Sequence, residues 1–413
     1  MERSRALRAR GPQASPHIPE EFPGSHVTEN KMRLLKRLPA HRRWLALAVV
    51  LGLLCVAILS LPLRETETSA PVDWHVNHAH KKQVHEHVRR VLEGQCRPSS
   101  TRHSLLARLP ASSRMTQAFL WKDLPLPDDI FRYPPPFGFR GLQHKAEELL
   151  KLLPDSESFP LPKNTSEKCR RCVVMGNGGI LRGLELGTLI DRFDTIIRLN
   201  SGPLGEFSID VGNRTSIRMS YPEGTPLHWI DTDPHTLFVA VVYKGVDVSW
   251  ISAMISKLSV SLWDWLFFWQ KVPDHIPLKR HRFRLLNPLV IRETALDLLK
   301  YPPPKPRLWG KDQNVPTMGV SALNLASLLC DEVSLAGFGY NLSQQGAPLH
   351  YFDQLPMSAM LRQTTHNVDR ETQLLQKLVR EGAVTDLTGG GTLLLLPQLN
   401  TFHLETCEKP GRK

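Results

Sequence analysis

An uninterrupted apolar run near the N-terminus constrains this chain more than any other feature. The segment WLALAVVLGLLCVAILSLPL, residues 44–63, has twenty residues and none of them is charged. At a rise of about 1.5 Å per residue, a helix of this length spans the roughly 30 Å hydrocarbon core of a bilayer. The sequence therefore predicts a single transmembrane helix over residues 44–63.

The residues around the apolar run indicate its orientation. Residues 1–43 form a basic tail that ends in KMRLLKRLPAHRR, and such segments stay on the cytosolic side of a membrane. We therefore expect a type II protein with an uncleaved signal-anchor and a luminal body. A cleaved signal peptide is the alternative, but the residues after the run, LPLR at 61–64, make a poor cleavage site.

The distribution of charge weighs against a nucleic-acid partner. The net charge is +12, and ten Lys/Arg against four Asp/Glu in residues 1–43 account for +6 of it. The remaining positive charge is spread over the rest of the chain without a long basic run. A mildly basic body suits an anionic small substrate.

The segment after the apolar run, residues 64–125, is polar and shows no sustained core periodicity, so we expect a luminal stem. It contains a cluster of five histidines, which is either a metal site or a solvated His-rich stretch: His75, His78, His80, His85 and His87. We favour the solvated stretch, because no cysteine or carboxylate cluster completes a coordination shell. Residues 126–391 are expected to form the folded domain, and residues 392–413 a C-terminal tail.

Within the folded domain, short apolar runs alternate with amphipathic stretches. The runs CVVMG, TIIRLN, TLFVAVVY and FRLLN predict strands at 172–176, 195–200, 236–243 and 283–287. Helices are expected at 144–154, 181–193, 250–258, 292–301, 321–330 and 370–382. Strand–helix alternation of this kind predicts an α/β fold with a mostly parallel central sheet.

The first predicted strand runs into a glycine-rich turn, VVMGNGGILRG. Gly176, Gly178 and Gly179 would let the backbone approach a ligand, and a helix that follows would point free N–H groups at a phosphate. The dinucleotide fingerprint requires a small residue where Leu181 stands, so a dinucleotide is not expected. A nucleotide-like ligand and a merely structural tight turn both remain open.

Cysteines and sequons bear on the compartment. In the cytosol the pair Cys169-Arg-Arg-Cys172 would suggest redox chemistry or zinc, whereas in a lumen disulfides are the default. Five cysteines lie outside the apolar run, and the odd number leaves one unpaired or bonded to another chain: Cys96, Cys169, Cys172, Cys330 and Cys407. Three glycosylation sequons support a luminal body, at Asn164, Asn213 and Asn341.

Two sets of polar residues are candidates for metal binding or catalysis. Asp231-Thr-Asp233 has the D-x-D form that holds manganese in many nucleotide-sugar transferases, but a polar loop before Pro234 is the simpler interpretation and the one we favour. His350 and His366 are suited to removing a proton from a sugar hydroxyl, although a lone histidine is more often structural.

One aromatic run stands out in the middle of the folded domain. It consists of Trp263, Trp265, Phe267, Phe268 and Trp269. Such a run can meet a sugar face or a membrane surface, but it more often packs in a core or a partly buried helix, which is what we expect here.

Four motifs, in order along the chain, resemble those of the animal sialyltransferases. Residues 169–218, CRRCVVMGNGGILRGLELGTLIDRFDTIIRLNSGPLGEFSIDVGNRTSIR, are similar to the family's long sialylmotif, and residues 316–341, PTMGVSALNLASLLCDEVSLAGFGYN, to its short one. HYFD resembles the third motif, and His366 with Glu371 fits the very short H-x4-E motif. CRRC and LHYFD resemble the α-2,3 subgroup, which acts on galactose. LFFWQKVPDHIPL and Asp353 most resemble those members that use the glycolipid lactosylceramide as acceptor.

The resemblance implies a GT-A-like Rossmann variant that transfers sialic acid from CMP-sialic acid to the galactose 3-hydroxyl with inversion. His366 would be the general base, and His350 would hydrogen-bond the donor phosphate. The implied substrate-binding residues are Asn177, Asn200, Thr317, Met318, Gly319, Gly337, Gly339, Tyr351 and Glu371. Cys172 would pair with Cys330, and Cys96 is the candidate partner of Cys169.

The resemblance also implies a setting. No metal or other cofactor is expected, because a nucleoside monophosphate carries less charge than a diphosphate and hydrogen-bond donors can stabilise it. We expect a single-pass protein of the Golgi membrane with a luminal catalytic domain, as a homo-oligomer or in a complex of Golgi glycosyltransferases. The alternatives are an α-2,3-sialyltransferase for glycoprotein galactose and a catalytically inactive luminal CMP-binding protein.

Overall fold

The computed structural model describes residues 40–59, 76–156, 169–304, 314–339, 348–356 and 365–389. The chain divides into two units, Met1–Thr68 and Ser69–Lys413. In the first unit, helix α2 covers Ala40–Leu59 and overlaps the apolar run. The expected transmembrane helix is not confirmed, since within the described ranges no helix is both long and apolar enough to cross a bilayer.

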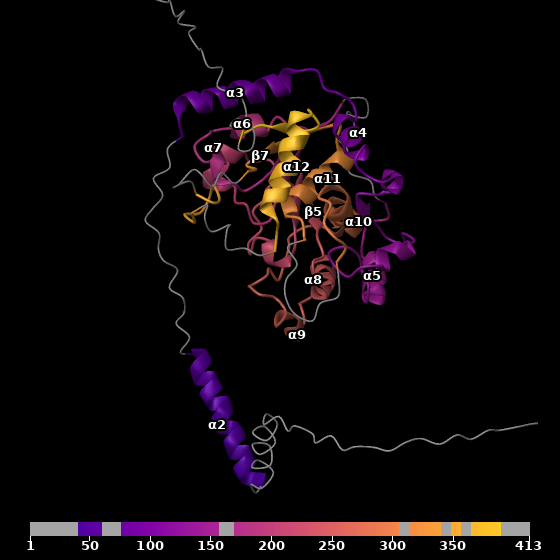
Figure 1. Cartoon of the computed structure of the whole chain (residues 1–413), viewed down its shortest axis with the longest axis vertical. Helices are drawn as coiled ribbons and strands as arrows, with labels where there is room; N and C mark the ends of the chain where they lie inside the picture. Colours follow the sequence, from indigo (N-terminus) through magenta and orange to yellow (C-terminus); the bar gives the residue numbers. More distant parts are fainter. Residues whose placement is uncertain are drawn as a thin grey trace, which may run out of the picture. The chain divides into compact units, whose positions relative to one another are not determined.

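The second unit is built on an eight-stranded sheet in the order β1-β6-β5-β4-β3-β2-β7-β8 (Figure 1). Every neighbouring pair is parallel except β1 with β6. The strands are β1 Phe119–Leu120, β2 Arg171–Met175, β3 Thr195–Leu199, β4 Ile217–Ser220, β5 Leu237–Ala240, β6 Phe283–Leu286, β7 Glu332–Ala336 and β8 Thr385–Asp386. The predicted α/β fold with a mostly parallel sheet is confirmed.

Helices connect the strands and cover both faces of the sheet. The α-helices of the second unit are α3 His78–Glu93, α4 Ser100–Leu106, α5 Gln143–Leu150, α6 Gly187–Ile190, α7 Ser208–Val211, α8 Gly245–Ser256, α9 Leu262–Trp265, α10 Pro288–Glu293, α11 Met318–Leu329 and α12 Val368–Arg380. A π-helical turn, η7 Thr294–Leu298, continues α10. Short 3-10 turns lie at Ala111–Met115, Asp128–Phe131, Gly179–Leu181, Gly205–Phe207, Pro222–Gly224 and Arg280–Arg282.

The central strands are buried on both faces, as parallel strands usually are. In β2, Val174 points into a core cluster shared with α10 and α11, whereas Val173 and Met175 point into the cluster that contains α3 and α6. Further along the sheet, Phe238 of β5 packs with Trp250 of α8 in a third cluster. The period of two along each strand therefore divides the core between the helical layers.

The helix expected at 181–193 does not form as one element. Gly183 and Glu185 both have positive φ angles, of 81° and 52°. Their amide groups donate hydrogen bonds to the carboxylate of Asp210, at 2.9 and 2.8 Å. The backbone is thus turned away from the helical path, and the helix that remains, α6, has only four residues.

The folded unit begins earlier in the sequence than the expected boundary at residue 126. Val84 and Val88 of α3 are buried in the core, and His85 and His87 donate from Nε2 to the carbonyl groups of Leu184 and Asp386. Strand β1 is part of the sheet. Much of the expected stem is therefore integral to the fold, and the two histidines hold α3 in place instead of facing solvent.

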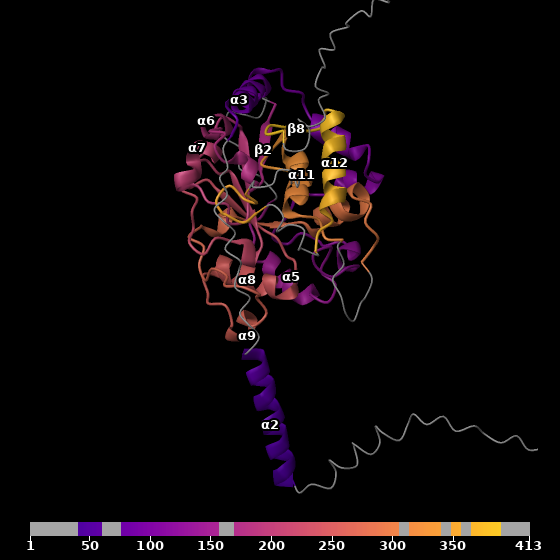
Figure 2. The ribbon, with the colours of Figure 1, turned by 60° about the vertical axis from the view of Figure 1, so that its left-hand side comes forward.

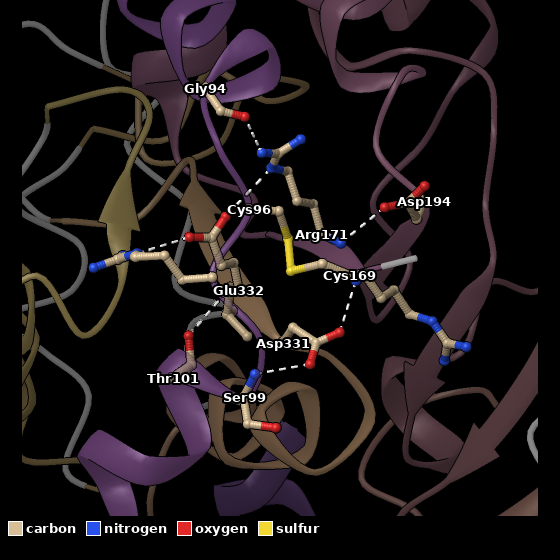
Figure 3. Close-up of a disulfide and its surroundings, with 12 residues drawn as sticks. Gly94, Cys96, Ser99, Thr101, Cys169, Arg171, Asp194, Asp331 and Glu332 are labelled. Atoms are coloured by element: carbon tan, nitrogen blue, oxygen red, sulfur yellow. Dashed lines mark hydrogen bonds and ion pairs between the residues drawn. A yellow bond between two sulfur atoms is a disulfide. The ribbon is translucent and has the colours of Figure 1, made fainter. Parts of the chain in front are cut away.

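Two disulfides tie the sequence together, and both implied pairs are confirmed. Cys96 bonds to Cys169, and Cys172 bonds to Cys330. Figure 3 shows the first of them in a polar cluster, where Asp331 accepts hydrogen bonds from the backbone amides of Ser99 and Arg170 at 2.8 and 2.7 Å. Of the remaining sites, Asn213 is exposed, whereas Asn164, Asn341 and Cys407 lie outside the described residues.

Candidate active site

The order of the strands marks where a ligand should bind. From β2 the chain adds β3 to β6 on one side and then returns to place β7 on the other. A parallel sheet binds ligands at such a switch point, in the crevice beyond the carboxyl ends of the strands. A cavity of about 780 Å³ lies there, lined by the segments that follow β2, β3, β4, β5 and β7, by the start of α11 and by residues around His366.

The glycine-rich turn after β2 forms one wall of this cavity. A Cβ atom on Gly176 would lie 2.4 Å from the carbonyl oxygen of Gly337, which itself has a φ of 71°. Gly178 donates from its amide to the same oxygen at 3.1 Å. The turns after β2 and β7 therefore pack against each other backbone to backbone, and Gly339 lines the cavity beside them. The turn is structural and lines the cavity as well.

Asn177 and Asn200 stand at the ends of neighbouring strands and both line the cavity. Asn177 donates from its side-chain amide to the carbonyl of Leu199 at 3.3 Å, which joins the two turns. Asn200 adopts a φ of 53°, a conformation that asparagine tolerates better than most residues. The structure thus brings together the two residues expected to contact the donor nucleotide.

The N-terminus of α11 faces the cavity through Thr317, Met318 and Gly319. Thr317 is the N-cap residue, and the first amide groups of a helix have no partner within the helix. Because these groups carry partial positive charge, they favour an anion such as a phosphate. The residues that the resemblance placed at the cytidine and phosphate site are therefore at a position suited to that role.

Glu371 of α12 fixes this N-terminus. Its carboxylate accepts hydrogen bonds from the backbone amide and the hydroxyl of Thr317, at 2.7 and 2.6 Å. Burial raises the pKa of Glu371 to about 7, and the hydrogen bonds from Thr317 oppose that rise. Glu371 lines the cavity, but its polar atoms are directed at the protein, so it positions Thr317.

His366 also lines the cavity. Its Nδ1 donates a hydrogen bond to the carbonyl of Val315 at 2.8 Å, so Nδ1 carries the proton and Nε2 is the unprotonated nitrogen of the neutral ring. Burial lowers the pKa of His366, although the bond to Val315 acts in the opposite direction. A histidine that is neutral near pH 7, with a defined tautomer, is equipped to accept a proton.

His350 lines the cavity as well, and Asp353, three residues further along the chain, holds its ring. Its Nδ1 is 2.5 Å from Asp353 Oδ2, and its ring stacks on Phe352 with the ring centroids 5.1 Å apart. An isolated bridge to Gly178 fixes the backbone of His350 against the glycine turn. Because Asp353 holds Nδ1 as a donor, Nε2 remains to interact with a ligand. Asp353 therefore positions the ring of His350, which stands three residues before it in the chain.

Tyr351 does not line the cavity, although it was expected to bind substrate. Its hydroxyl donates to the carbonyl of Pro203 at 2.6 Å, its ring is buried, and burial raises the pKa of this phenol to about 12. The amide of Tyr351 donates to the carbonyl of Asn177 at 3.1 Å. Tyr351 therefore supports the wall that carries Asn177.

The other half of the cavity is formed by Tyr221, Glu223, Tyr243, Lys244 and Trp269, of which only Trp269 stood out in the sequence, as part of the aromatic run. The first four follow the carboxyl ends of β4 and β5, so the strand order is the signal that would have identified them. Lys244 bonds to Glu223 at 2.7 Å and to Asp247 at 2.8 Å. The two tyrosine rings meet edge to face, with the centroids 5.2 Å apart.

The D-x-D motif is not at the cavity. Asp231 is buried and bonds to Arg218 at 2.8 and 2.5 Å and to the hydroxyl of Thr215 at 2.6 Å. Asp233 accepts a hydrogen bond from the amide of His235 two residues on, at 2.7 Å. Both aspartates lie in a loop, as expected, and their carboxylates bind protein groups, but Asp231 is a buried partner of Arg218 and not a solvated loop residue.

The aromatic run is divided between core and surface. Trp265 and Phe268 pack against the core cluster that contains α8, as expected. Trp263, Phe267 and Trp269 instead remain largely exposed, so the expectation of core packing is wrong for these three.

The sequence and the fold are both similar to those of known proteins. The family model described as glycosyltransferase family 29 (sialyltransferase) matches residues 119–383. The chain is 44% identical to lactosylceramide α-2,3-sialyltransferase of Rattus norvegicus, over 88% of this chain and 93% of the rat protein. It is 46% identical to the Homo sapiens protein of the same name, over 83% of this chain and 82% of the human protein.

Two further comparisons are more distant. CMP-N-acetylneuraminate-β-1,4-galactoside α-2,3-sialyltransferase of Homo sapiens is 37% identical, over 72% of this chain and 78% of that protein. A crystal structure of a mammalian sialyltransferase in complex with Gal-β-1-3GalNAc-ortho-nitrophenol is similar in fold, with a TM-score of 0.53 and 22% identity. It covers 71% of this chain and 98% of the solved chain.

Proposed function

Since this chain belongs to glycosyltransferase family 29, the sialyltransferases, we propose that it transfers sialic acid from CMP-sialic acid to the 3-hydroxyl of the terminal galactose of lactosylceramide. The observation that carries the choice of acceptor is the identity of 44% and 46% to the rat and human lactosylceramide enzymes, against 37% to the human β-1,4-galactoside enzyme. The geometry of the cavity is consistent with the chemistry that this reaction needs.

The galactose 3-oxygen attacks C2 of sialic acid, and the C2–O bond to the CMP phosphate breaks. The hydroxyl proton goes to Nε2 of His366, the acceptor nitrogen in the tautomer set by Val315. A positioned base of this kind contributes on the order of 10²–10⁴-fold in rate. The electron pair of the broken bond leaves on the CMP phosphate, and attack from the opposite face inverts the anomeric centre.

The departing phosphate is the group that most needs stabilisation. In this proposal, the amide groups at the start of α11 donate hydrogen bonds to it, and so does Nε2 of His350 in the imidazolium form, in which Nδ1–H is donated to Asp353; Glu371 keeps Thr317 in register. Asn177 and Asn200 contact the nucleotide. We propose that transfer requires no metal, because these donors suffice for a monophosphate leaving group.

The half of the cavity formed by Tyr221, Glu223, Lys244 and Trp269 is then available for the acceptor. A tryptophan ring offers a flat apolar surface to the C–H face of a sugar, and the partly exposed ammonium group of Lys244 can donate hydrogen bonds to sugar hydroxyls, while Glu223 holds it in place. This division of the cavity places donor chemistry beside α11 and acceptor binding beside β4 and β5.

We further propose that the enzyme works as a single-pass protein of the Golgi membrane, with its catalytic unit in the lumen. The two disulfides suit an oxidising compartment. The uncharged run at residues 44–63 and the basic residues before it supply the anchor and its orientation.

An acceptor panel tests the proposal. Purified full chain in detergent is given CMP-sialic acid with either lactosylceramide or desialylated glycoproteins, each with and without EDTA. We expect preferred transfer to lactosylceramide, unchanged in EDTA. Preference for the glycoproteins would replace the acceptor, and CMP binding without transfer to any acceptor would indicate an inactive binding protein. Loss of activity in EDTA that added Mn²⁺ restores would overturn the metal-free mechanism alone.

A further inference from the structure

The segment around α9, residues 257–271, presents an apolar surface to solvent. Within it Leu262 is 84% exposed, Trp263 76% and Phe267 68%, and Leu258, Leu266 and Trp269 are exposed as well. Figures 1 and 2 show α9 at the end of the folded unit opposite α3. Single exposed apolar residues are normal on a folded unit, but six large ones within one short segment indicate an interaction site.

The inner side of the segment packs on the core, and this packing keeps its outer side turned toward solvent. Trp265 and Phe268 pack on the core, and their rings meet edge to face with centroids 6.3 Å apart. The ammonium group of Lys244 lies over the ring of Phe268, 4.9 Å from its centroid. Gln270 donates a hydrogen bond from its side chain to the carbonyl of Glu223. The outward-facing side chains are therefore held on an ordered support.

The apolar surface is continuous with the mouth of the active-site cavity. Trp269 lines the cavity and is also exposed beside Phe267. Gln270 binds to Glu223, another cavity residue. A body that covers the segment thus lies next to the half of the cavity assigned to the acceptor.

The composition of the segment fits a lipid surface better than a protein partner. Its exposed side chains are Leu, Trp and Phe, the residues that enter the boundary between headgroups and acyl chains. Exposed lysines flank it at Lys257 and Lys271, and Asp264 is the one acidic residue between them in the sequence. Such lysines meet lipid phosphates while the aromatic rings enter the interface.

We propose that residues 257–271 form a membrane-docking element that seats the catalytic unit on the lipid surface and receives the glycolipid acceptor from it. This rests on the proposed function, because it assumes an acceptor whose sugar extends from a bilayer. With the segment inserted, the sugar head group enters the cavity past Trp269 while the ceramide stays in the membrane. The surface therefore favours a galactose carried by a lipid in a bilayer over the same sugar free in solution.

The test compares two acceptors with the same sugar, lactosylceramide in phosphatidylcholine vesicles and a water-soluble lactoside. Full chain carrying Trp263→Asp together with Phe267→Asp should lose about tenfold or more in transfer to vesicle lactosylceramide and keep its activity on the soluble lactoside within about twofold. Replacing the same two residues by leucine should restore most of the vesicle activity. The matched control is Ile209→Asp, an equally drastic change at an exposed apolar residue of α7, which should change neither activity.

A direct measurement of contact accompanies the kinetics. With brominated phosphatidylcholine in the vesicles, tryptophan fluorescence of wild type should be quenched, and Trp263→Phe should remove part of that quenching. Equal loss on both acceptors, or no quenching at position 263, would overturn the proposal. If the aspartate variants instead dissociate a dimer seen by light scattering, the surface is an interface between copies. If wild type does not use lactosylceramide in detergent, the proposed acceptor is wrong. The quenching measurement then still tests whether residues 257–271 contact lipid, independently of the acceptor.

Discussion

Replacing Glu371 by glutamine should change how the stability of the enzyme depends on pH. Glu371 is buried, and its pKa is raised to about 7 in the folded protein from an ordinary value of 4.5. Glutamine has nearly the same shape, accepts the hydrogen bond from the amide of Thr317, and donates to its hydroxyl. Glutamine does not titrate, so the variant removes the dependence of stability on the protonation of residue 371 and keeps the hydrogen bonds to Thr317.

The sign follows from which state holds the proton more tightly. Between pH 4.5 and 7 the folded protein keeps Glu371 protonated while the unfolded chain has released the proton, so rising pH favours unfolding. One pKa unit corresponds to about 1.36 kcal/mol. The shift on Glu371 therefore costs wild type roughly 3 kcal/mol of unfolding free energy between pH 4.5 and 8, a loss that the variant does not suffer.

The measurement is denaturant unfolding of wild type and Glu371→Gln in parallel, with the disulfides intact, from pH 4.5 to 8. Other buried groups also titrate, including His366 and Asp247, but they are common to both proteins and cancel in the difference. The free energy of unfolding of the variant should gain roughly 3 kcal/mol on wild type across the range. Parallel curves would refute the raised pKa and the account of how Glu371 is held.

Two further predictions concern single side chains. His366→Ala should fold normally, judged by its disulfides and its unfolding midpoint, and should bind CMP, yet transfer sialic acid at least about 100-fold more slowly. In wild type, the acid limb of the kcat profile should lie below pH 6.5, because burial lowers the pKa of His366. Turnover that persists in the variant would exclude His366 as the base. Asp231→Ala should destabilise the enzyme by about 3–5 kcal/mol, because it leaves the buried guanidinium of Arg218 unpaired, whereas Asp233→Ala in the same motif should cost less than about 1 kcal/mol; equal losses in denaturant unfolding would contradict the assignment of these roles.

The four strands predicted from the sequence each contain a run of adjacent large apolar residues. They correspond to β2, β3, β5 and β6, whereas β1 and β8, of two residues each, and β4 and β7 were not predicted. In β4, Arg218 and Ser220 alternate with Ile217 and Met219, and Arg218 is buried in an ion pair with Asp231 of a loop. In β7, Glu332 and Ser334 break up the apolar residues in the same way. Long-range pairing of polar groups is not visible in local periodicity.

The donor half of the site was predictable and the other half was not. Asn177, Thr317, His350 and His366 stand in motifs that the family resemblance identifies. Lys244 and the other acceptor-half residues that follow β4 and β5 carry no motif, and only the sheet order shows that they face the same cavity. Trp269 lies in the aromatic run, but nothing in the sequence placed it at the cavity. The aromatic run was misjudged because α9 is a single turn, which cannot bury successive large side chains on one face.

The disulfide between Cys96 and Cys169 has a practical consequence for any shortened form of the enzyme. The family match begins at residue 119, and a soluble version cut there would appear complete by sequence comparison. It would lack α3, whose valines cover part of the core, and it would leave Cys169 as a reactive thiol in an oxidising compartment. A secreted form should therefore start before Asn77, which caps α3, and one that starts at residue 119 should accumulate as disulfide-linked aggregates.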